Sequence, residues 1–310
     1  MTAQLGRRDM LKSILAAAAG LGAGRLADIL SLRALHADPD DGTPMPTRPL
    51  GRTGHDVGLF SIGGESTVEQ RGRRDEAVAI INKALDLGVN YIDTSHIYGG
   101  GGSEENIGAV MQSRREEVYL ATKTRARDYD GAMRECEVSL RRLRTDHIDL
   151  YQHHLVRSDA EIERITGENG ALRAFRKLRE EGVVRHLGIT GHSSRVLANA
   201  LRKYDYDCAL ITLNPAGMHM DDTAHLEDFF RLTAEKQTGV VAMKVAGKGG
   251  IFGRGINIKQ ALEYALSYPV CTAIVGITEI GQIEENAAIA RAFSKLDDEE
   301  MKHIRELASG

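Results

Sequence analysis

The chain has 310 residues, of which 42% are hydrophobic and 27% charged, and its formal net charge is −4. This composition is typical of a folded soluble protein and argues against disorder. The near-neutral charge disfavours a general nucleic-acid binder, which needs a basic face. Cys136, Cys208 and Cys271 are far apart in the sequence, which excludes a disulfide framework and CxxC-type metal or iron–sulfur sites.

The N-terminal residues differ in character from the rest of the chain. Arg7 and Arg8 precede Asp-Met-Leu-Lys and an uncharged stretch, rich in Ala and Gly, from residue 13 to 24. A basic region followed by an apolar region of this length is typical of a signal peptide, and it is shorter than a membrane span. Paired arginines resemble a twin-arginine export signal, which is an address and not an anchor. The alternative is an amphipathic helix with a chance arginine pair.

These features divide the chain into three parts. We expect residues 1–37 to be a twin-arginine signal peptide and residues 38–48 to be a polar linker rich in proline. Residues 49–310 form the folded domain. With such a signal, we expect the twin-arginine export machinery to bind and export the protein, which would be periplasmic or secreted. We expect no stable membrane span.

From residue 49 onward, runs rich in β-branched residues alternate with longer helical patterns. A short hairpin is expected at residues 49–57 and an extra C-terminal helix at residues 297–307. The expected strands are 57–62, 89–93, 118–123, 148–153, 184–190, 208–213, 240–244 and 272–276. The expected helices are 73–87, 103–111, 131–143, 170–181, 193–202, 223–236, 256–267 and 279–291.

Eight successive strand–helix units predict an α/β fold with a single (β/α)8 TIM barrel, an N-terminal hairpin and an extra C-terminal helix. The competing fold is a doubly wound nucleotide-binding sheet, which needs a GxGxxG turn between a strand and a helix. The glycine runs at residues 99–102 and 247–255 lack that spacing. We therefore expect the barrel.

Polar residues gather where consecutive strands of this barrel are expected to end. Asp93 and Tyr98 follow the second strand, Lys123 ends the third, and His153 and His154 end the fourth. Barrel active sites lie at the C-terminal ends of the strands, so these groups converge on one mouth. A cation beside a phenol lowers the pKa of the phenol, and a carboxylate holds the cation in place. A tyrosine in that setting can act as a general acid.

Longer motifs follow one another in order across residues 48–305. They include Pro-Leu-Gly-Arg-Thr-Gly from residue 49, Asn-Tyr-Ile-Asp-Thr-Ser-His-Ile-Tyr-Gly from residue 90, and Asp-His-Ile-Asp-Leu-Tyr-Gln-His-His from residue 146. With these motifs the chain resembles the aldo-keto reductases. The resemblance implies hydride transfer between NADP or NAD and a small-molecule carbonyl substrate. It places the family's catalytic tetrad on Asp93, Tyr98, Lys123 and His154.

The resemblance also implies a set of cofactor-binding residues, although this sequence departs from the family's pattern in several of them. Gly191 stands where the family has an asparagine for the carboxamide, and Thr190 precedes it. Asn214 is our candidate for a second carboxamide contact, with Thr212 as the alternative. Met243 stands where the family stacks a tyrosine on the nicotinamide. The candidate cofactor-binding residues are Thr190, Asn214, Met243, Lys244, Gly247, Lys248, Gly249, Gln282, Glu285 and Asn286.

The cations that the family uses to hold the 2′-phosphate of NADPH are missing here. Gly276 and Gln282 occupy those positions, while Glu285 and Asn286 match the family's adenine-binding pair. Lys244 or Lys248 could compensate. We therefore expect the preference for NADPH to be weaker than is usual for the family.

Two other functions are compatible with parts of the sequence. The changed carboxamide and stacking positions leave open a low-turnover sensor that holds a nicotinamide on the same barrel and signals to a partner. A metal-dependent barrel hydrolase would use the histidines, but the first strand lacks His-x-His. Adjacent residues of a strand also point to opposite faces, which separates His153 from His154. We expect no metal site and no nucleic-acid partner.

Overall fold

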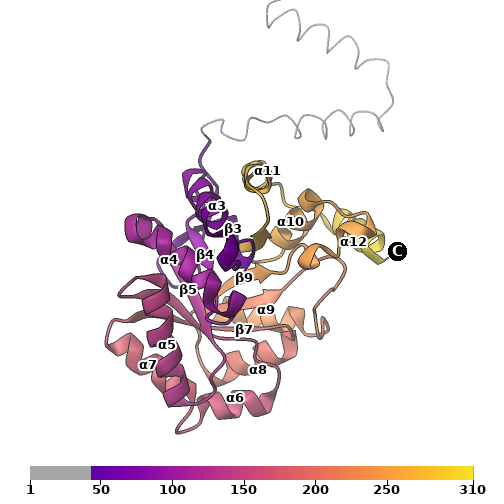
Figure 1. Cartoon of the computed structure of the whole chain (residues 1–310). Coiled ribbons are helices and arrows are strands. Elements are labelled where there is room, and N and C mark those ends of the chain that lie inside the picture. The colour runs from indigo at the N-terminus through magenta and orange to yellow at the C-terminus, as the bar shows by residue number, and fades with distance from the viewer. Residues whose placement is uncertain (1–42, 310) are drawn as a thin grey trace, which may run out of the picture. The chain divides into compact units, whose positions relative to one another are not determined.

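The computed structural model describes residues 43–309, so the expected signal peptide and residues 38–42 of the expected linker lie outside the described residues. Eight parallel strands close into a barrel in the order β10-β3-β4-β5-β6-β7-β8-β9, and helices surround it (Figure 1). The prediction of a (β/α)8 barrel is confirmed. The pairing of β3 with β10 closes the barrel.

The barrel strands fall close to their predicted positions. The strand at Ile148–His153 has the predicted bounds, and the others differ by a few residues at either end. Their bounds are β3 Phe60–Ser66, β4 Tyr91–Asp93, β5 Tyr119–Thr124, β6 Ile148–His153, β7 Val184–Gly191, β8 Cys208–Thr212, β9 Gly239–Met243 and β10 Thr272–Ile277.

The first predicted strand is the largest departure. The structure divides it into β2, Asp56–Gly58, which pairs antiparallel with β1, Thr47–Pro49, and the barrel strand β3. The predicted hairpin is therefore present, and it begins at Thr47. β3 continues through Gly63 and Gly64, which lack the residue types that mark a strand. A Cβ atom at Gly64 would lie 2.5 Å from Ser103 Oγ, so close packing explains the glycine.

The helices cover the outside of the barrel, and the predicted C-terminal helix is present as α12. One helix of eight residues, α6, was not predicted; it lies between the expected strand 148–153 and the expected helix 170–181. Ser158 caps it by accepting a hydrogen bond from the Glu161 amide. The bounds are α3 Arg74–Asp86, α4 Gly102–Arg114, α5 Tyr129–Leu143, α6 Asp159–Thr166, α7 Ala171–Glu180, α8 Ser194–Lys203, α9 Leu226–Glu235, α10 Ile258–Ser267, α11 Ile280–Arg291 and α12 Asp298–Ser309.

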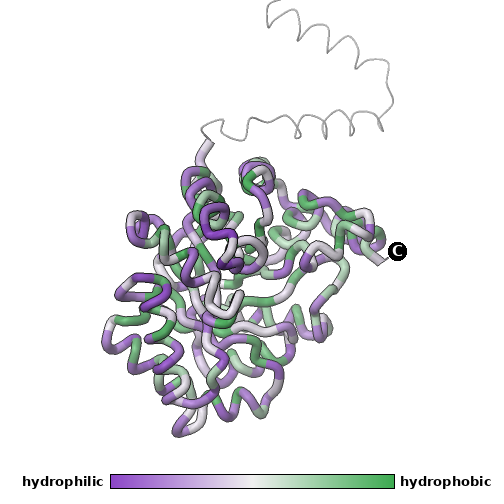
Figure 2. Tube along the Cα trace, viewed as in Figure 1, coloured by the Kyte–Doolittle hydropathy of each residue, from purple (hydrophilic) through white to green (hydrophobic). Residues whose placement is uncertain are grey.

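Alternation along the strands creates two apolar layers. Tyr91, Ala121 and Leu150 point into the barrel, whereas their neighbours Ile92 and Leu120 pack between the strands and the helices. Hydrophobic residues accordingly concentrate on the strands and on the inner sides of the helices (Figure 2). The same alternation directs the last inward residue of each strand to the mouth of the barrel.

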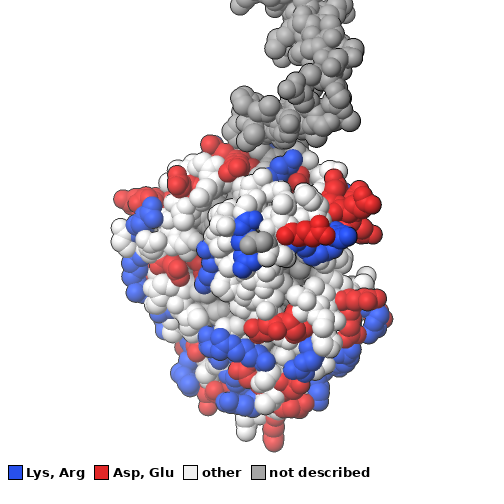
Figure 3. All heavy atoms as spheres, turned by 90° about the vertical axis from the view of Figure 1, so that its right-hand side faces the viewer, with Lys and Arg blue, Asp and Glu red and all other residues white. Residues whose placement is uncertain are grey.

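The surface carries both signs of charge. On the face shown in Figure 3, Lys and Arg side chains are interspersed with Asp and Glu side chains. Within residues 43–309, no helix has the length and apolar character needed to cross a membrane.

Candidate active site

Asp93, Lys123 and Gln152 form one layer of polar side chains inside the mouth of the barrel. Asp93 pairs in register with Ala121 of β5, and Lys123, two residues further along β5, pairs with Gln152 of β6. The two-residue period of the strands therefore turns all three side chains inward. Lys123 Nζ donates to Asp93 Oδ2 and, at 2.7 Å, to the Thr94 carbonyl. The ammonium group is thus fixed from two sides.

Tyr98 lies above this ion pair because the chain turns sharply after it. It begins the 3-10 turn Tyr98–Gly101, in which Gly99, Gly100 and Gly101 all have positive φ. A Cβ atom at Gly99 would lie 2.0 Å from the Glu69 carbonyl oxygen, so only glycine fits there. Lys123 Nζ lies 3.4 Å from the Tyr98 hydroxyl and 4.8 Å from the centre of its ring. This distance allows the ammonium to stabilise negative charge on the phenol oxygen.

His154 completes the group from the end of β6. Its Nδ1 lies 3.0 Å from Ser95 Oγ, and its ring meets the Tyr98 ring edge-on, with the centroids 5.6 Å apart. Burial, followed by the charge of Lys123, lowers the pKa of His154 far below its usual range, so the imidazole is neutral. The structure therefore brings together the four residues proposed as a tetrad from the sequence.

The electrostatics of this group differ from the expectation. Burial raises the pKa of Asp93 and lowers the pKa of Lys123, while the charge of each partner opposes the shift. Burial and then the charges of Asp93 and Glu65 raise the pKa of Tyr98 well above its usual range. The lowering expected from Lys123 is not seen in the net shift, because desolvation of the phenolate dominates. Tyr98 thus keeps its proton.

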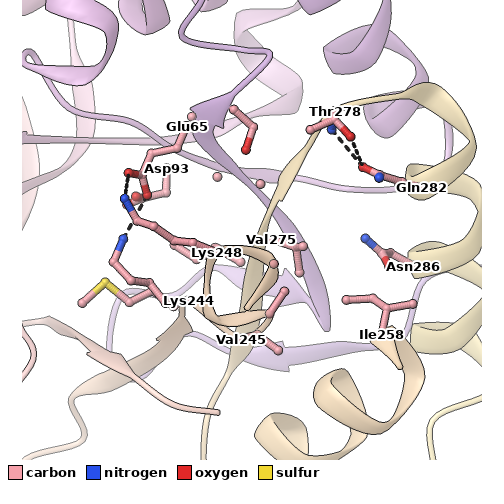
Figure 4. Close-up of a pocket in the computed structure, with 18 of the residues that line it drawn as sticks. Glu65, Asp93, Lys244, Val245, Lys248, Ile258, Val275, Thr278, Gln282 and Asn286 are labelled. Carbon is pink, nitrogen blue, oxygen red and sulfur yellow. Dashed lines mark hydrogen bonds and ion pairs between the residues drawn. The ribbon is translucent and has the colours of Figure 1, made fainter. Parts of the chain in front are cut away.

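A cavity of about 680 Å³ opens beside these residues. Asp93 lines one part of it, and Thr278, Gln282 and Asn286, from the end of β10 and from α11, line the opposite part (Figure 4). Tyr98, beside the Lys123–Asp93 pair, also lines the cavity. The predicted cofactor-binding residues that line it are Met243, Lys244, Lys248, Gly249, Gln282, Glu285 and Asn286. These residues are distant in sequence, and the pairing of β10 with β3 and β9 brings them to one cavity.

Three predicted cofactor-binding residues do not line this cavity. Thr190 Oγ1 accepts from the Leu155 amide at 2.8 Å. The side-chain amide of Asn214 donates to the carbonyls of Met218 and Lys244 and accepts from the Met218 amide. Asn214 therefore braces its own loop, and its hydrogen-bonding groups are engaged there. Gly247 is buried against Met218 and begins the turn Gly247–Gly249, in which all three residues have positive φ.

Sequence reasoning did not single out Glu65, which the structure places in the middle of the site. Its carboxylate pairs with Lys244 Nζ at 3.0 Å and with Lys248 Nζ at 2.9 Å (Figure 4). Although burial alone would raise it, these two ammonium groups bring the pKa of Glu65 to about 2. Because β10 lies between β3 and β9 in the barrel, the ion pairs span the end of β10.

Asn286 presents an unused acceptor to the cavity wall. It is buried, and its Oδ1 has no hydrogen-bond partner among the described residues. A buried amide oxygen without a donor is costly, so a ligand that offers an N–H group at this point would be stabilised. An adenine amino group is such a donor, and the cavity volume is in the range of small-molecule and cofactor sites. The residues present therefore fit a dinucleotide.

Comparisons with known proteins agree with this geometry. A model of the Aldo/keto reductase family matches residues 57–261. The chain is 28% identical to "Uncharacterized oxidoreductase YqkF" of Bacillus subtilis (strain 168), over 84% of this chain and 96% of that protein. It is 27% identical to the NADP(+) aldo-keto reductase yakc of Schizosaccharomyces pombe, over 57% of this chain and 54% of that protein. The structure of aldo-keto reductase AKR11C1 from Bacillus halodurans, holo form, superposes with a TM-score of 0.71 at 25% identity, covering 86% of this chain and 97% of that one.

Proposed function

Because the chain belongs to the aldo/keto reductase family and is an oxidoreductase of that family, we propose that it reduces the carbonyl of an aldehyde or ketone, or oxidises the corresponding alcohol, with NADPH or NADH. The observation that carries this proposal is the buried Lys123–Asp93 ion pair beneath the Tyr98 hydroxyl, at the edge of a cavity of cofactor size. A relative named for NADP(+) supports a nicotinamide cofactor.

The residues of the chain supply the proton chemistry. The reduced nicotinamide, when bound, supplies the hydride for the carbonyl carbon. Tyr98 is protonated before the reaction, because its pKa is raised. It can therefore act as a general acid and donate this proton to the carbonyl oxygen. The phenolate that remains is stabilised by Lys123 at 3.4 Å and regains a proton from solvent. The carbonyl is thereby reduced to an alcohol. The negative charge that develops on the Tyr98 oxygen lies beside the fixed ammonium group of Lys123.

His154 positions the substrate in this scheme. When Ser95 Oγ donates to Nδ1, the ring proton lies on Nε2, and this N–H can donate to the carbonyl oxygen. The strongly lowered pKa of His154, caused first by burial, keeps it from competing with Tyr98 as the acid. Tyr98 and His154 then hold the same oxygen from two directions.

Two assays test the proposal. Oxidation of NADPH and NADH is followed with reactive aldehydes such as 4-nitrobenzaldehyde and methylglyoxal, in steady state and in a single turnover. Turnover supports the proposal. A chain that binds the dinucleotide tightly but does not oxidise it with any reactive carbonyl is not a reductase, and a nicotinamide-binding sensor would then be the better description.

We also propose that residues 1–37 direct export through the twin-arginine route, which would place the protein in the periplasm or outside the cell. The support is the Arg7-Arg8 pair ahead of the uncharged stretch at 13–24. Fusion of residues 1–48 to a reporter that is active only after export, compared with the same fusion carrying Arg7→Lys and Arg8→Lys, tests this directly. Equal export by both fusions contradicts the twin-arginine route.

A further inference from the structure

We propose that this chain prefers the dinucleotide without a 2′-phosphate, binding NADH more tightly than NADPH. The inference rests on the proposed function, since it assumes that the cavity holds a nicotinamide dinucleotide. It goes beyond that function because it assigns the selectivity to particular residues of α11. The NADP(+) in the name of one relative would suggest the opposite preference.

The orientation of the dinucleotide follows from the position of the catalytic residues. The reacting ring must lie beside Tyr98, which lines one part of the cavity together with Asp93. The adenosine half must therefore reach the opposite part, where Thr278, Gln282 and Asn286 lie (Figure 4). The unpaired Asn286 Oδ1 on that side suits the adenine amino group.

The wall around the adenosine half is neutral or acidic. Gln282 Oε1 accepts from the Thr278 amide at 2.9 Å and from Thr278 Oγ1 at 3.1 Å, so its acceptor is already engaged. Glu285, on the same helix, adds a carboxylate to the cavity lining. A phosphate group carries nearly two negative charges, and a neighbouring carboxylate repels it. A ribose 2′-hydroxyl can instead donate a hydrogen bond to a carboxylate, and acidic residues in other dinucleotide sites accept such a bond.

The cations of the cavity lie elsewhere. Among the described residues that line it, only Lys244 and Lys248 are basic, and both are paired with Glu65. Figure 4 shows this cluster on the side of Asp93, opposite Gln282 and Asn286. The two lysines are therefore placed to meet the pyrophosphate, which NADH and NADPH share. They do not compensate for the cations missing at positions 276 and 282.

One further arginine approaches the adenosine side without lining the cavity. Arg73 donates to Thr67 Oγ1 at 3.0 Å, and Thr67 in turn donates to the Thr278 carbonyl at 3.1 Å. The Nε and Nη2 atoms of Arg73 donate to the two oxygens of the Glu76 carboxylate. The Glu76 carboxylate offsets this charge, and Arg73 is not among the described residues that line the cavity.

Dissociation constants of the full chain for NADH and NADPH, read from the fluorescence of the reduced nicotinamide ring, test the inference. We expect NADH to bind about tenfold more tightly, the effect of one unfavourable charge contact. NADPH binding as tightly as NADH, or more tightly, overturns the inference and leaves the proposed function intact. Failure of both dinucleotides to bind overturns the inference and the proposed function together.

Matched variants locate the selectivity. Gln282→Arg should tighten NADPH binding about tenfold with little change for NADH, because it adds a cation beside the 2′-position. Glu285→Gln keeps the shape of the wall and should also favour NADPH, which covers the case in which Gln282→Arg does not fold. Glu65→Gln releases Lys244 and Lys248 and should tighten both dinucleotides equally. A gain for NADPH alone in Glu65→Gln would assign the lysines to the 2′-phosphate and overturn the inference.

Discussion

The side-chain amide of Gln152 donates a hydrogen bond to Asp93 Oδ1 at 3.1 Å, on the carboxylate whose other oxygen accepts from Lys123. Both side chains are buried, and the carbonyl oxygen of the Gln152 amide has no partner among the described residues. Asp93 is thus held at both oxygens, which fixes the direction from which it meets Lys123. Gln152 is a positioning residue, because it acts on the reaction through Asp93.

Removing this hydrogen bond should impair catalysis more than binding. In Gln152→Leu, Asp93 loses a donor that lowers its pKa, and the carboxylate is held less firmly. We expect kcat to fall about tenfold, the effect of one hydrogen bond to a charged group, with KM almost unchanged. The acid limb of the pH–rate profile should move to higher pH, because the Asp93 pKa rises further. A loss of folded protein without this shift would show a purely structural role.

Tyr98→Phe removes the proposed acid while keeping the ring. We expect kcat for carbonyl reduction to fall by about 10² to 10⁴, the usual contribution of a general acid, while the dissociation constant for the dinucleotide changes less than about twofold. Stopped-flow kinetics and dinucleotide fluorescence measure the two quantities. Ser95→Ala provides the comparison, since it frees His154 Nδ1 and should give an intermediate loss.

The pH dependence of the same reaction follows from two opposite shifts. The pKa of Tyr98 is raised, mainly by burial, so the phenol keeps its proton well into the alkaline range. The pKa of His154 is lowered by burial, so the imidazole stays neutral well into the acidic range. Neither group titrates near neutrality, so neither should contribute a limb to the kcat/KM profile between about pH 6 and 9. A decline across this range that disappears in Tyr98→Phe would contradict these protonation states.

The Lys123–Asp93 pair should show a strong thermodynamic coupling. Lys123→Met leaves the buried Asp93 carboxylate without its cation, which typically costs about 3 to 5 kcal/mol of folding free energy. The double variant with Asp93→Asn removes the uncompensated charge and should recover much of that loss. Urea unfolding of the four chains measures the coupling. Additive losses would mean that the two charges do not depend on one another.

His153 should make the protein sensitive to mild acid. It is fully buried against Phe175, and neither ring nitrogen has a partner among the described residues. Burial, followed by the charge of Arg127, lowers the pKa of His153 well below its usual range. Below pH 6.5, the unfolded chain therefore binds a proton at His153 that the folded chain does not bind. The free energy of unfolding then falls by about 1.4 kcal/mol for each unit by which the pH is lowered.

Replacing this ring should remove the effect. From pH 8 to pH 5, His153→Leu should gain about 2 kcal/mol of stability relative to the natural chain. Thermal and urea unfolding at the two pH values measure the change. His303→Leu, at an exposed position on α12, serves as the matched control. Equal pH dependence of His153→Leu and the natural chain would show that the buried ring accepts a proton.

The sequence was informative where local patterns determine the structure. The β-rich runs located the barrel strands, and the strand ends located Asp93, Lys123 and His154, because a parallel barrel brings those ends together. Glu65 could not be found in this way. Its partners Lys244 and Lys248 lie at least 179 residues away, and their meeting depends on how the barrel closes.

Asn214 and Tyr98 show a second limit. Nothing near Asn214 in the sequence reveals that its amide bonds to Met218 and Lys244 once the loop has folded. The sign of the Tyr98 pKa shift was equally out of reach, because it depends on how deeply the phenol is buried. Residue type and spacing indicate which groups can meet, whereas desolvation decides how they ionise.

The pairing of β3 with β10 limits when the cofactor site can form during synthesis of the chain. Residues of β3 line the cavity together with residues of β10 and α11, so the site needs both ends of the barrel domain's sequence at once. A nascent chain that has not yet released Asn286 from the ribosome cannot bind the dinucleotide as proposed. The dinucleotide can therefore bind only late in biosynthesis. Any fragment that ends before α11 should fail to bind the dinucleotide, even when its remaining strands pair.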